Sequence, residues 1–425
     1  MDPVPLDGPR PYEELLAEAG QTITPEGIGG ERALRLFDEV LSEACISVDH
    51  PRYLSFIPAA PTEAATLFDL VVGASSVYGG SWLEGAGAVF AENQALRWVA
   101  DLAGYPQRAG GVFVQGGTLG NLSALVAARH NAASARADRP ARWVAVCSAE
   151  AHSSVEHAAR VMDIDVVAVP VDDRGRMTGE ELERTLVARG SDDVFAVVAT
   201  GGTTNYGVVD DLAGVADVCN ERGIWLHVDG AYGLAALAAP SARELFNGIE
   251  RTDSFIVDPH KWLFAPFDAC ALLYRDPDLG RRAHMQSAGY LDVITDSGEY
   301  NPSDYAIHLS RRARGLPFWF SLATHGTNAY SAAVEKGLEL ARQAVAEIRK
   351  RPELELVRDP MLSVVVFRRL GWSSEEYHAW SDRLLAEGFA LVVPTRHGDE
   401  TVARFAFVNP RTTLQDVTDI LDSMR

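Results

Sequence analysis

Short apolar runs alternate with helical segments between residues 111 and 275. The runs are rich in β-branched residues and nearly continuously apolar, which is typical of strands buried on both faces of a sheet. Helical segments between several of them favour parallel crossover connections, and therefore an α/β fold with a sheet flanked by helices. The expected strands span residues 143–148, 165–171, 194–200, 224–230, 254–258 and 269–275.

One connecting helix carries clear end signals. The segment DLAGVADVCNERG, residues 211–223, begins with Asp and ends with Gly. A side-chain acceptor at the first position and a glycine just past the end are preferred helix caps. This segment is therefore predicted to be a helix between two parallel strands.

The two flanks have other patterns. Residues 1–60 are helical patches broken by Pro and Gly, 68–105 is largely helical, and the polar stretch 276–315 is expected to be a mobile loop region. A long helix is expected at 316–350. The tail then predicts strands at 363–369, 389–395 and 402–409 and helices at 373–388 and from Thr412, which indicates a small α+β domain. We therefore expect an N-terminal helical segment, a large α/β domain and a small C-terminal domain, with bounds at 1–60, 61–325 and 326–425.

Composition limits the function classes. The chain has 425 residues, with 38 Lys+Arg against 59 Asp+Glu and a net charge of −21. This balance argues against nucleic-acid and anionic-membrane partners, because both need a positive surface. No apolar stretch reaches about 18 residues, so a membrane span is not expected. The acidic, Pro-rich start lacks the features of a signal peptide, and a cytoplasmic location is expected.

The cysteines are widely separated and mostly lie in apolar runs. No CxxC pair is present, so they are predicted to be reduced, buried small side chains rather than a disulfide or zinc set. No metal site is expected. The residues concerned are Cys45, Cys147, Cys219 and Cys270.

Two ionisable residues directly follow predicted strands. Lys261, in DPHKW, is either a surface lysine or a Schiff-base lysine whose pKa is lowered by burial and nearby cations. Asp229, in HVDGAYG, is either a turn residue or an acid partner for a protonated ring nitrogen. His260 is either a phosphate ligand or a polar loop residue.

Three further segments offer weaker signals. The glycine-rich helix start at 114–129 supplies backbone N–H groups and the Thr118 hydroxyl for a phosphate, although such starts are often plain turns. His152 follows a strand and would stack on a flat ring or simply face solvent. ATGGTTNYG, residues 199–207, offers threonine donors at another strand end. One aromatic phosphate ligand with an aldehyde would use all five sites, and their joint placement makes coincidence much less plausible.

Together these segments resemble the pyridoxal-phosphate group II decarboxylases, the family of aromatic amino acid, glutamate and histidine decarboxylases. The matching segments occur in the family's order and cover nearly the whole chain. They are HPRYLSFIP, QGGTLGNLSALVAAR, AHSSVEHAA, ATGGTTNYG, HVDGAYG, DPHKW and FAFVNPRTT. The resemblance implies a fold-type-I subunit with a mostly parallel seven-stranded sheet, pyridoxal 5'-phosphate as cofactor, and a homodimer with the active site at the interface.

The resemblance also implies roles for the cofactor residues. Lys261 would form the Schiff base, Asp229 would pair with the pyridine nitrogen, and His152 and Ala231 would lie on the two ring faces. The remaining cofactor contacts would come from Gly117, Thr118 and His260 at the phosphate and from Thr203. Family members usually have Asn where this chain has Asp258, and a carboxylate near a phosphate is unfavourable, so Asp258 is expected to point away or to bind another group.

On the substrate side, the segment 300–314 resembles the family's mobile catalytic loop. Tyr300 would protonate the substrate carbon, with Tyr305 as the alternative and plain packing as the other interpretation. Arg404 would bind the α-carboxylate. The arginines of the loop exit, Arg311, Arg312 and Arg314, are expected to be structural charges on a solvated turn.

The side-chain pocket implied by the resemblance favours an aromatic substrate. It consists of Tyr53, Phe56, Pro58 and Trp82. Glu84 departs from the aromatic enzymes, and would either meet a polar substrate group or lie on the surface. The predicted reaction is decarboxylation of an L-amino acid to its amine and CO₂. The alternatives are an oxygen-dependent aldehyde synthase on the same scaffold and a non-catalytic metabolite-binding protein.

Overall fold

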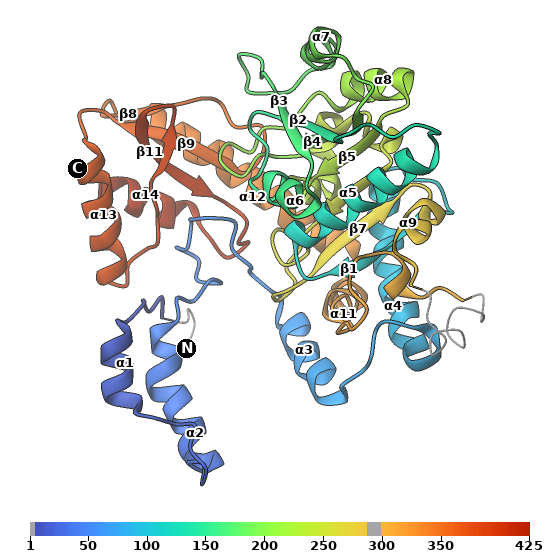
Figure 1. Cartoon of the computed structure of the whole chain (residues 1–425). Helices are drawn as coiled ribbons and strands as arrows, with labels where there is room; N and C mark the ends of the chain where they lie inside the picture. Colours follow the sequence, from blue (N-terminus) through green and yellow to red (C-terminus); the bar gives the residue numbers. More distant parts are fainter. Residues whose placement is uncertain (1–4, 287–298) are drawn as a thin grey trace.

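The computed structural model describes residues 5–286 and 299–425. Its large sheet has seven strands in the order β1-β7-β6-β5-β4-β2-β3 (Figure 1). Strands β3, β2, β4, β5 and β6 run parallel to one another, whereas β7 is antiparallel to both β6 and β1. The strands are β1 Gly110–Val114, β2 Val144–Ser148, β3 Asp165–Val169, β4 Val194–Thr200, β5 Trp225–Asp229, β6 Ser254–Val257 and β7 Cys270–Tyr274. This confirms the predicted α/β class and all six expected strands; β1 was not predicted.

Helices cover both faces of the large sheet. On one face, α5 (Gly117–Ser134), α6 (Ser154–Met162) and α9 (Pro277–His284) pack against alternate strand residues. The other face packs against α4 (Trp82–Leu102), α7 (Gly179–Arg189), α8 (Leu212–Arg222) and α11 (Leu316–His325). Burial on both faces explains why β2, β4, β5, β6 and β7 are apolar along most of their length.

Helix α8 shows how local sequence sets these connections. The Asp211 side chain accepts a hydrogen bond from the Gly214 backbone N–H, and Gly223 ends the helix with a left-handed φ of 64°. Both caps were predicted. They fix the length of the crossover, so that β4 and β5 end side by side at Thr200 and Asp229.

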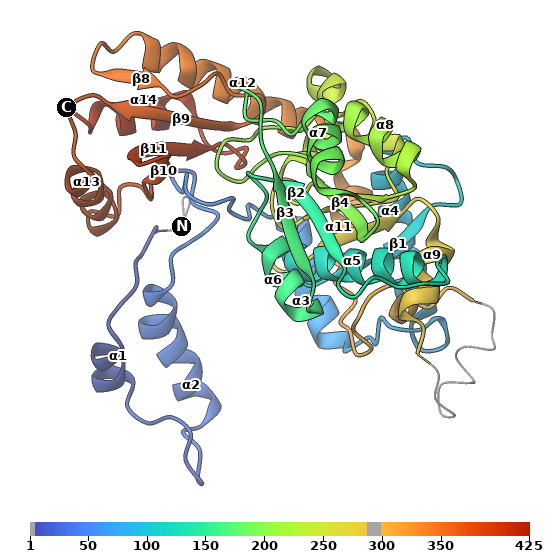
Figure 2. The same ribbon diagram turned by 45° about the horizontal axis from the view of Figure 1, so that its top comes forward.

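A small antiparallel sheet lies beside the large one, in the order β10-β11-β9-β8 (Figure 2). Its strands are β8 Leu354–Leu356, β9 Val364–Arg369, β10 Thr395–His397 and β11 Glu400–Ala406. A separate apolar core joins this sheet to α12 (Thr327–Arg349), α13 (Ser374–Ala386) and α14 (Leu414–Asp422). This arrangement matches the expected α+β character of the tail.

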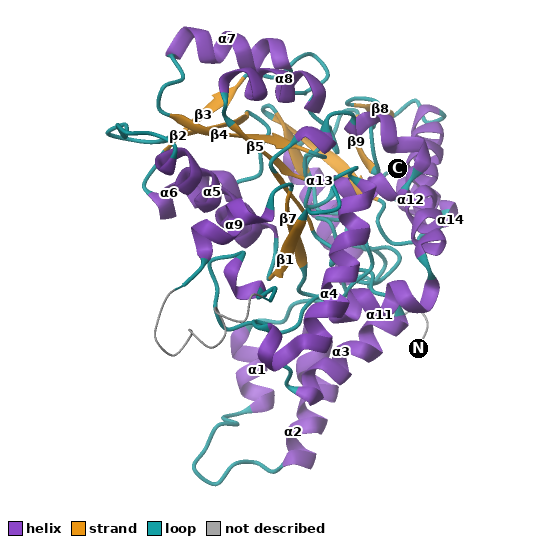
Figure 3. Cartoon of the chain, turned by 90° about the vertical axis from the view of Figure 1, so that its right-hand side faces the viewer, coloured by secondary structure: helices purple, strands orange, loops and turns teal. Residues whose placement is uncertain are grey.

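The N-terminal helices extend away from the two sheets (Figure 3). Helices α1 (Tyr12–Ala19) and α2 (Gly30–Leu36) have no buried residue, whereas α3 (Glu63–Ser75) packs on α11. Shorter helical turns are Phe37–Leu41, Ser42–Ala44, Gly233–Ala238, Pro240–Phe246, Ile249–Arg251 and Pro302–Asp304. None of the helices in the described ranges is long and apolar enough to cross a membrane.

Several expectations about local structure were wrong. The long helix expected at 316–350 is two helices, because Gly326 between them adopts a φ of 75°. In the region 276–315, expected to be a mobile loop, Pro277–His284 form α9, and residues 287–298 lie outside the described part of the chain. The segment 389–395 does not form the expected strand: Leu391 makes an isolated bridge to Tyr53, and β10 begins only at Thr395.

Two side-chain predictions were also wrong. Arg311 is not on a solvated turn, because its side chain is fully buried and paired with Glu92 at 2.8 Å. Cys45 is exposed, whereas Cys147, Cys219 and Cys270 are buried as expected, and all four are free thiols.

Candidate active site

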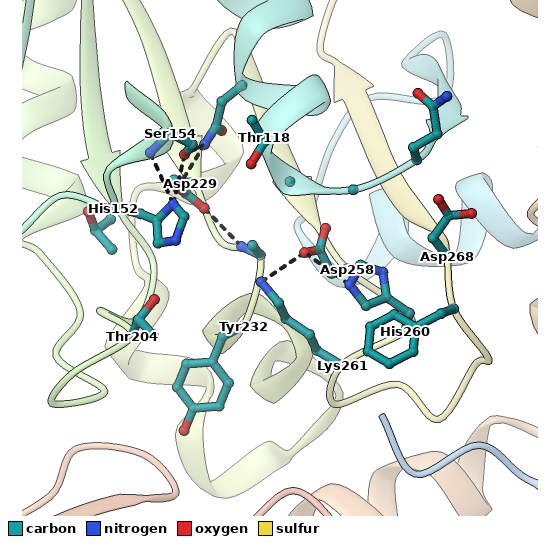
Figure 4. A pocket seen from close by; sticks show the side chains of 18 residues that line it. Thr118, His152, Ser154, Thr204, Asp229, Tyr232, Asp258, His260, Lys261 and Asp268 are labelled. Carbon is teal, nitrogen blue, oxygen red and sulfur yellow. Dashed lines mark hydrogen bonds and ion pairs between the residues drawn. The ribbon is translucent and has the colours of Figure 1, made fainter. Parts of the chain in front are cut away.

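A cavity of about 250 Å³ opens where the parallel strands end and α5 begins (Figure 4). We call it the strand-end cavity. Ligands in open α/β sheets bind at this edge, because parallel strands present their carboxyl ends together. The lining residues are Gln115, Gly116, Gly117, Thr118, Asn121, His152, Ser154, Thr200, Gly202, Thr204, Asp229, Ala231, Tyr232, Asp258, His260, Lys261, Phe267 and Asp268.

Lys261 projects into the strand-end cavity from the turn after β6. Its Nζ lies 2.9 Å from Asp258 Oδ2, and the Asp258 side chain is only 2% exposed. Burial lowers the pKa of Lys261, but the paired carboxylate outweighs burial and holds that pKa above its ordinary value. The prediction of a lowered pKa was therefore wrong for the free protein. Asp258 lines the cavity and binds another group, as one of the two expectations had it.

Asp229 ends β5 and is 6% exposed. Its Oδ2 accepts a hydrogen bond from Asn121 Nδ2 at 2.9 Å, and its Oδ1 accepts one from the Ala231 backbone N–H at 3.2 Å. Asn121 was missed by the sequence interpretation. The available signal was a large polar amide on the buried face of α5, whose other buried residues are mostly small or apolar.

A chain of hydrogen bonds behind Asp229 fixes the direction of these donors. Trp225 Nε1 donates to Ser254 Oγ at 2.9 Å, Ser254 Oγ lies 2.8 Å from His227 Nδ1, and His227 Nε2 lies 2.9 Å from Asn121 Oδ1. An indole N–H can only donate, so the serine hydroxyl is free to donate to His227. Burial lowers the pKa of His227 to about 4, so the ring is neutral and passes its single proton toward Asn121. The Asn121 amide then faces Asp229 as a donor, and the Asp229 carboxylate is its acceptor.

His152 borders the same cavity after β2. Ser154 donates its backbone N–H to His152 Nδ1 at 3.2 Å, and Ser154 Oγ lies 2.9 Å from the same atom. Because Nδ1 accepts the backbone bond, a neutral ring carries its proton on Nε2. Asn121 Nδ2 also donates to Ser154 Oγ at 2.8 Å. The same amide therefore orients both His152, through Ser154, and Asp229.

The start of α5 leaves room for an anion. A Cβ at Gly117 would lie 3.2 Å from both Ala231 Cβ and Asp258 Oδ2, so any side chain there would intrude on the cavity. Backbone N–H groups at a helix start, here beside the exposed Thr118, favour negative charge. His260 also faces the cavity, with Nδ1 2.7 Å from the Ala269 carbonyl oxygen.

Two buried oxygens of the strand-end cavity lack hydrogen-bond partners within the described residues. They are Thr200 Oγ1 and Asp258 Oδ1. A buried polar atom without a partner costs free energy, so such atoms are expected where a ligand supplies the partner. Both therefore indicate a polar ligand in this cavity.

Arg404 does not line the strand-end cavity itself, but it contacts Thr204, which does, and it is 5% exposed. Its guanidinium donates to the carbonyl oxygens of Phe56 at 2.9 Å, Thr204 at 2.5 Å and Asn205 at 3.3 Å. Within the described residues it has no acidic partner, and burial lowers its pKa to about 10. A buried cation held only by carbonyl groups is suited to binding a carboxylate ligand.

Thr203 and Tyr300 were predicted to act at the site, but the structure gives them other contacts. Thr203 is buried and its Oγ1 accepts the Val208 backbone N–H at 3.1 Å; Thr200 and Thr204 line the cavity instead. The Tyr300 hydroxyl donates to the Gly111 carbonyl of β1, and its ring stacks on Tyr305 with centroids 4.4 Å apart. Neither tyrosine lines the cavity of the single chain, and the role of Tyr300 or Tyr305 as proton donor stays a prediction.

The predicted side-chain pocket is not assembled within one chain. Tyr53 packs in a small core with Leu6 and Leu391, and the Trp82 backbone N–H donates to Asn301 Oδ1 at 2.9 Å. Phe56 is 60% exposed and adopts a φ of 52°, which is uncommon for a bulky residue. Its carbonyl nevertheless accepts a hydrogen bond from Arg404.

Of the two interpretations of Glu84, the structure favours a surface residue over a substrate contact. It is exposed at the start of α4, where Ser81 Oγ donates to its carboxylate at 2.9 Å and the Glu84 backbone N–H donates back to Ser81 Oγ at 3.3 Å. This reciprocal pair is a helix-capping arrangement. It explains the residue without a substrate.

The chain is similar to known proteins in both sequence and fold. Residues 31–370 match the family model described as the pyridoxal-dependent decarboxylase conserved domain. An aromatic-L-amino-acid decarboxylase of Bacillus atrophaeus is 31% identical over 416 residues, which is 94% of this chain and 86% of that protein. The Mus musculus aromatic-L-amino-acid decarboxylase is 34% identical over 84% of this chain and 78% of that protein. The crystal structure of Oryza sativa TDC with PLP and tryptamine has the same fold, with a TM-score of 0.92 at 24% identity over 99% of this chain and 93% of that one.

Proposed function

The chain belongs to the pyridoxal-dependent decarboxylase family, and we propose that it converts an aromatic L-amino acid to the corresponding amine and CO₂. One observation carries the proposal. Lys261 and Asp229 face the same strand-end cavity, beside the glycine-opened start of α5. An amine for an aldehyde, an acid for a ring nitrogen and backbone N–H groups for a phosphate are the groups that pyridoxal 5'-phosphate requires.

The residues present fit this cofactor. Lys261 would hold the aldehyde carbon, Asp229 the pyridine nitrogen, and Gly117, Thr118 and His260 the phosphate. Thr200 Oγ1, a buried oxygen without a partner, would contact the cofactor in place of Thr203. When bound, pyridoxal phosphate withdraws electrons from the substrate α-carbon, which allows the bond to the carboxylate to break.

Residues of this chain would hold the cofactor ring in place for that chemistry. The directed hydrogen bonds from His227 through Asn121 keep Asp229 an acceptor, so that it can hold a proton on a ring nitrogen. His152 presents Nε2 to the cavity and would cover one face of the cofactor ring, with Ala231 against the other. Tyr300 is assigned no proton-transfer step, because its hydroxyl is bonded to the Gly111 carbonyl.

Arg404 supports the choice of an amino acid as substrate. It is a buried cation without an acidic partner in the described part of the chain, and a substrate α-carboxylate would supply one. The Phe56 ring is exposed next to this arginine and offers an apolar surface. Both relatives described above are named for aromatic substrates, and together these points favour an aromatic side chain.

We also propose that the protein is a cytoplasmic homodimer. Apolar side chains of the projecting N-terminal segment are exposed in one chain, among them Leu16 at 44%, Leu34 at 69% and Phe37 at 57%. A second copy would cover such a surface. Four free cysteines suit a reducing compartment. Sedimentation equilibrium would measure the mass of the assembly, and a monomer would contradict the dimer.

The function is tested on purified protein with a panel of amino acids. We expect cofactor absorbance in the wild type, its loss in Lys261→Ala, and release of CO₂ and amine in equal amounts from an aromatic amino acid. CO₂ only from histidine, glutamate or 2,4-diaminobutyrate would refute the aromatic assignment. Aldehyde, peroxide and ammonia in place of amine would instead show the oxygen-dependent reaction.

A further inference from the structure

We propose that Asp258 is a positioning residue that keeps Lys261 as an ammonium ion in the cofactor-free protein, and so makes capture of the cofactor aldehyde depend on pH. The ion pair is a property of the chain itself, with Nζ and Oδ2 2.9 Å apart. Only the identity of the aldehyde rests on the proposed function.

The backbone holds both partners in place. The Lys261 backbone N–H donates to the Asp258 carbonyl at 2.9 Å, so the two residues occupy one tight turn after β6. The Asp258 backbone N–H donates to the Ala231 carbonyl at 2.9 Å, which ties the same turn to the end of β5. The Asp258 side chain is only 2% exposed and the Lys261 side chain 24% exposed, so the carboxylate is largely shielded from solvent while Nζ can still be reached from the cavity.

Few other groups compete for this pair. His260 Nε2 lies 3.7 Å from Asp258 Oδ2, and the buried Cys270 thiol faces the carboxylate from β7. Asp229 adds a weaker attraction for the Lys261 ammonium. Asp268, also at the cavity, is paired with Arg314. Asp258 is thus the main carboxylate acting on Lys261, and its own pKa is held low by Lys261 and His260 against the effect of burial.

The pair determines what must happen before Lys261 reacts. An ammonium nitrogen has no lone pair and cannot attack an aldehyde. Nζ must first lose a proton to solvent, against the attraction of the Asp258 carboxylate. The freed lone pair then attacks the aldehyde carbon, and a C=N bond forms as the aldehyde oxygen leaves as water with the two remaining amine hydrogens. Asp258 stays a carboxylate throughout, so the fraction of Lys261 that can react follows the pH of the solution.

The test compares wild type with Asp258→Asn, whose amide keeps the shape of the carboxylate without its charge. Full-length protein freed of cofactor is mixed with pyridoxal phosphate from about pH 6 to 10, and the rate of capture is followed by absorbance. Without the carboxylate, burial lowers the pKa of Lys261, and we expect capture at pH 7 to accelerate about ten-fold or more, with a profile that levels off at lower pH. Asp193→Asn is the control, since it removes a carboxylate that is paired with an arginine, Arg189, but does not line the cavity, and it should leave the wild-type profile.

A second probe separates two ways in which Asp258 can act. Pyridoxal lacks the phosphate, so an effect through Lys261 accelerates capture of both aldehydes alike. Acceleration for pyridoxal phosphate alone would show that Asp258 acts by repelling phosphate, and would overturn the proposal. Identical pH profiles in wild type and Asp258→Asn would overturn it too.

A measurement on the wild-type protein tests the same proposal without relying on the folding of a variant. The rate at which acetic anhydride acylates Lys261 is measured against pH by mass spectrometry of its peptide. Reactivity that still rises at the ordinary pKa of lysine, about 10.4, supports the ion pair. A plateau well below that pH refutes it. If neither aldehyde binds at any pH, the proposed function fails, while acylation still decides the role of Asp258.

Discussion

Arg404 offers a way to separate substrate binding from stability. Burial lowers its pKa from 12.5 to about 10, so the charged form is disfavoured by about 3 kcal/mol relative to water. Replacing Arg404 by Met removes that cost but also removes hydrogen bonds to three carbonyl oxygens, worth about 1.5 kcal/mol each at the low end. The two effects oppose each other, and we expect Arg404→Met to lose about 1–2 kcal/mol of unfolding free energy.

The effect on substrate should be far larger than the effect on folding. A carboxylate that enters this buried site without a cation loses about 3 kcal/mol or more, which lowers kcat/KM by roughly a hundred-fold or more. The product amine has no carboxylate, so its inhibition constant should stay within about two-fold of the wild-type value. Arg404→Lys restores charge without the planar fork and should recover only part of the loss.

Three measurements check this reasoning together: chemical denaturation, kcat/KM for CO₂ release, and inhibition by the amine. If Arg404→Met weakens the amino acid and the amine by the same factor, Arg404 supports the shape of the site and does not bind the carboxylate. An unchanged kcat/KM would show that Arg404 takes no part in substrate binding.

The other predictions concern packing and protonation. Tyr300→Phe should keep turnover within about two-fold and lose about 1 kcal/mol of unfolding free energy, because its hydroxyl bonds only the Gly111 carbonyl; loss of turnover without loss of stability would contradict this. Asn121→Ala removes the donor to Asp229 Oδ2 and should weaken retention of pyridoxal phosphate about ten-fold in equilibrium dialysis, whereas unchanged retention would deny its positioning role. The pKa of His227 falls from 6.5 to about 4 on folding, so between these pH values the unfolded state binds more protons, and the stability decreases as the pH is lowered, by about 3 kcal/mol at pH 4. Denaturation at a series of pH values should show a shallower slope for His227→Gln, and an unchanged slope would place the effect in other groups.

The parallel strands and the cofactor-side residues could be predicted because their signals are local. Each strand is a short apolar run, and each functional residue follows one directly, as Asp229 follows β5. Parallel pairing then brings these ends to one edge without further information. β1 was missed because Gly110–Val114 is short, starts with two glycines, and pairs only with β7, which lies far along the chain.

Two predictions failed because tertiary contacts, which the local pattern does not contain, determine the structure there. Residues 389–394 are mostly apolar because Ala390 and Val392 pack in the small core, yet their one strand-like pairing is the single bridge from Leu391 to Tyr53. Arg311 sits in a polar stretch that predicts solvent exposure. Its buried pairing with Glu92, 219 residues earlier, has no local signal.

The substrate side of the site depends on contacts that no local pattern contains. Arg404 comes from β11 of the small sheet, and its carbonyl partners come from the segment before α3 and from the turn after β4. One guanidinium thus joins three distant parts of the chain at the edge of the strand-end cavity. Phe56 is held beside it with its ring 60% exposed, so the surface that would enclose a substrate side chain is not completed by this ring and the cavity alone. In the proposed function, the α-carboxylate would therefore be bound within one chain, whereas the substrate side chain would need a further surface, which the proposed second copy would supply.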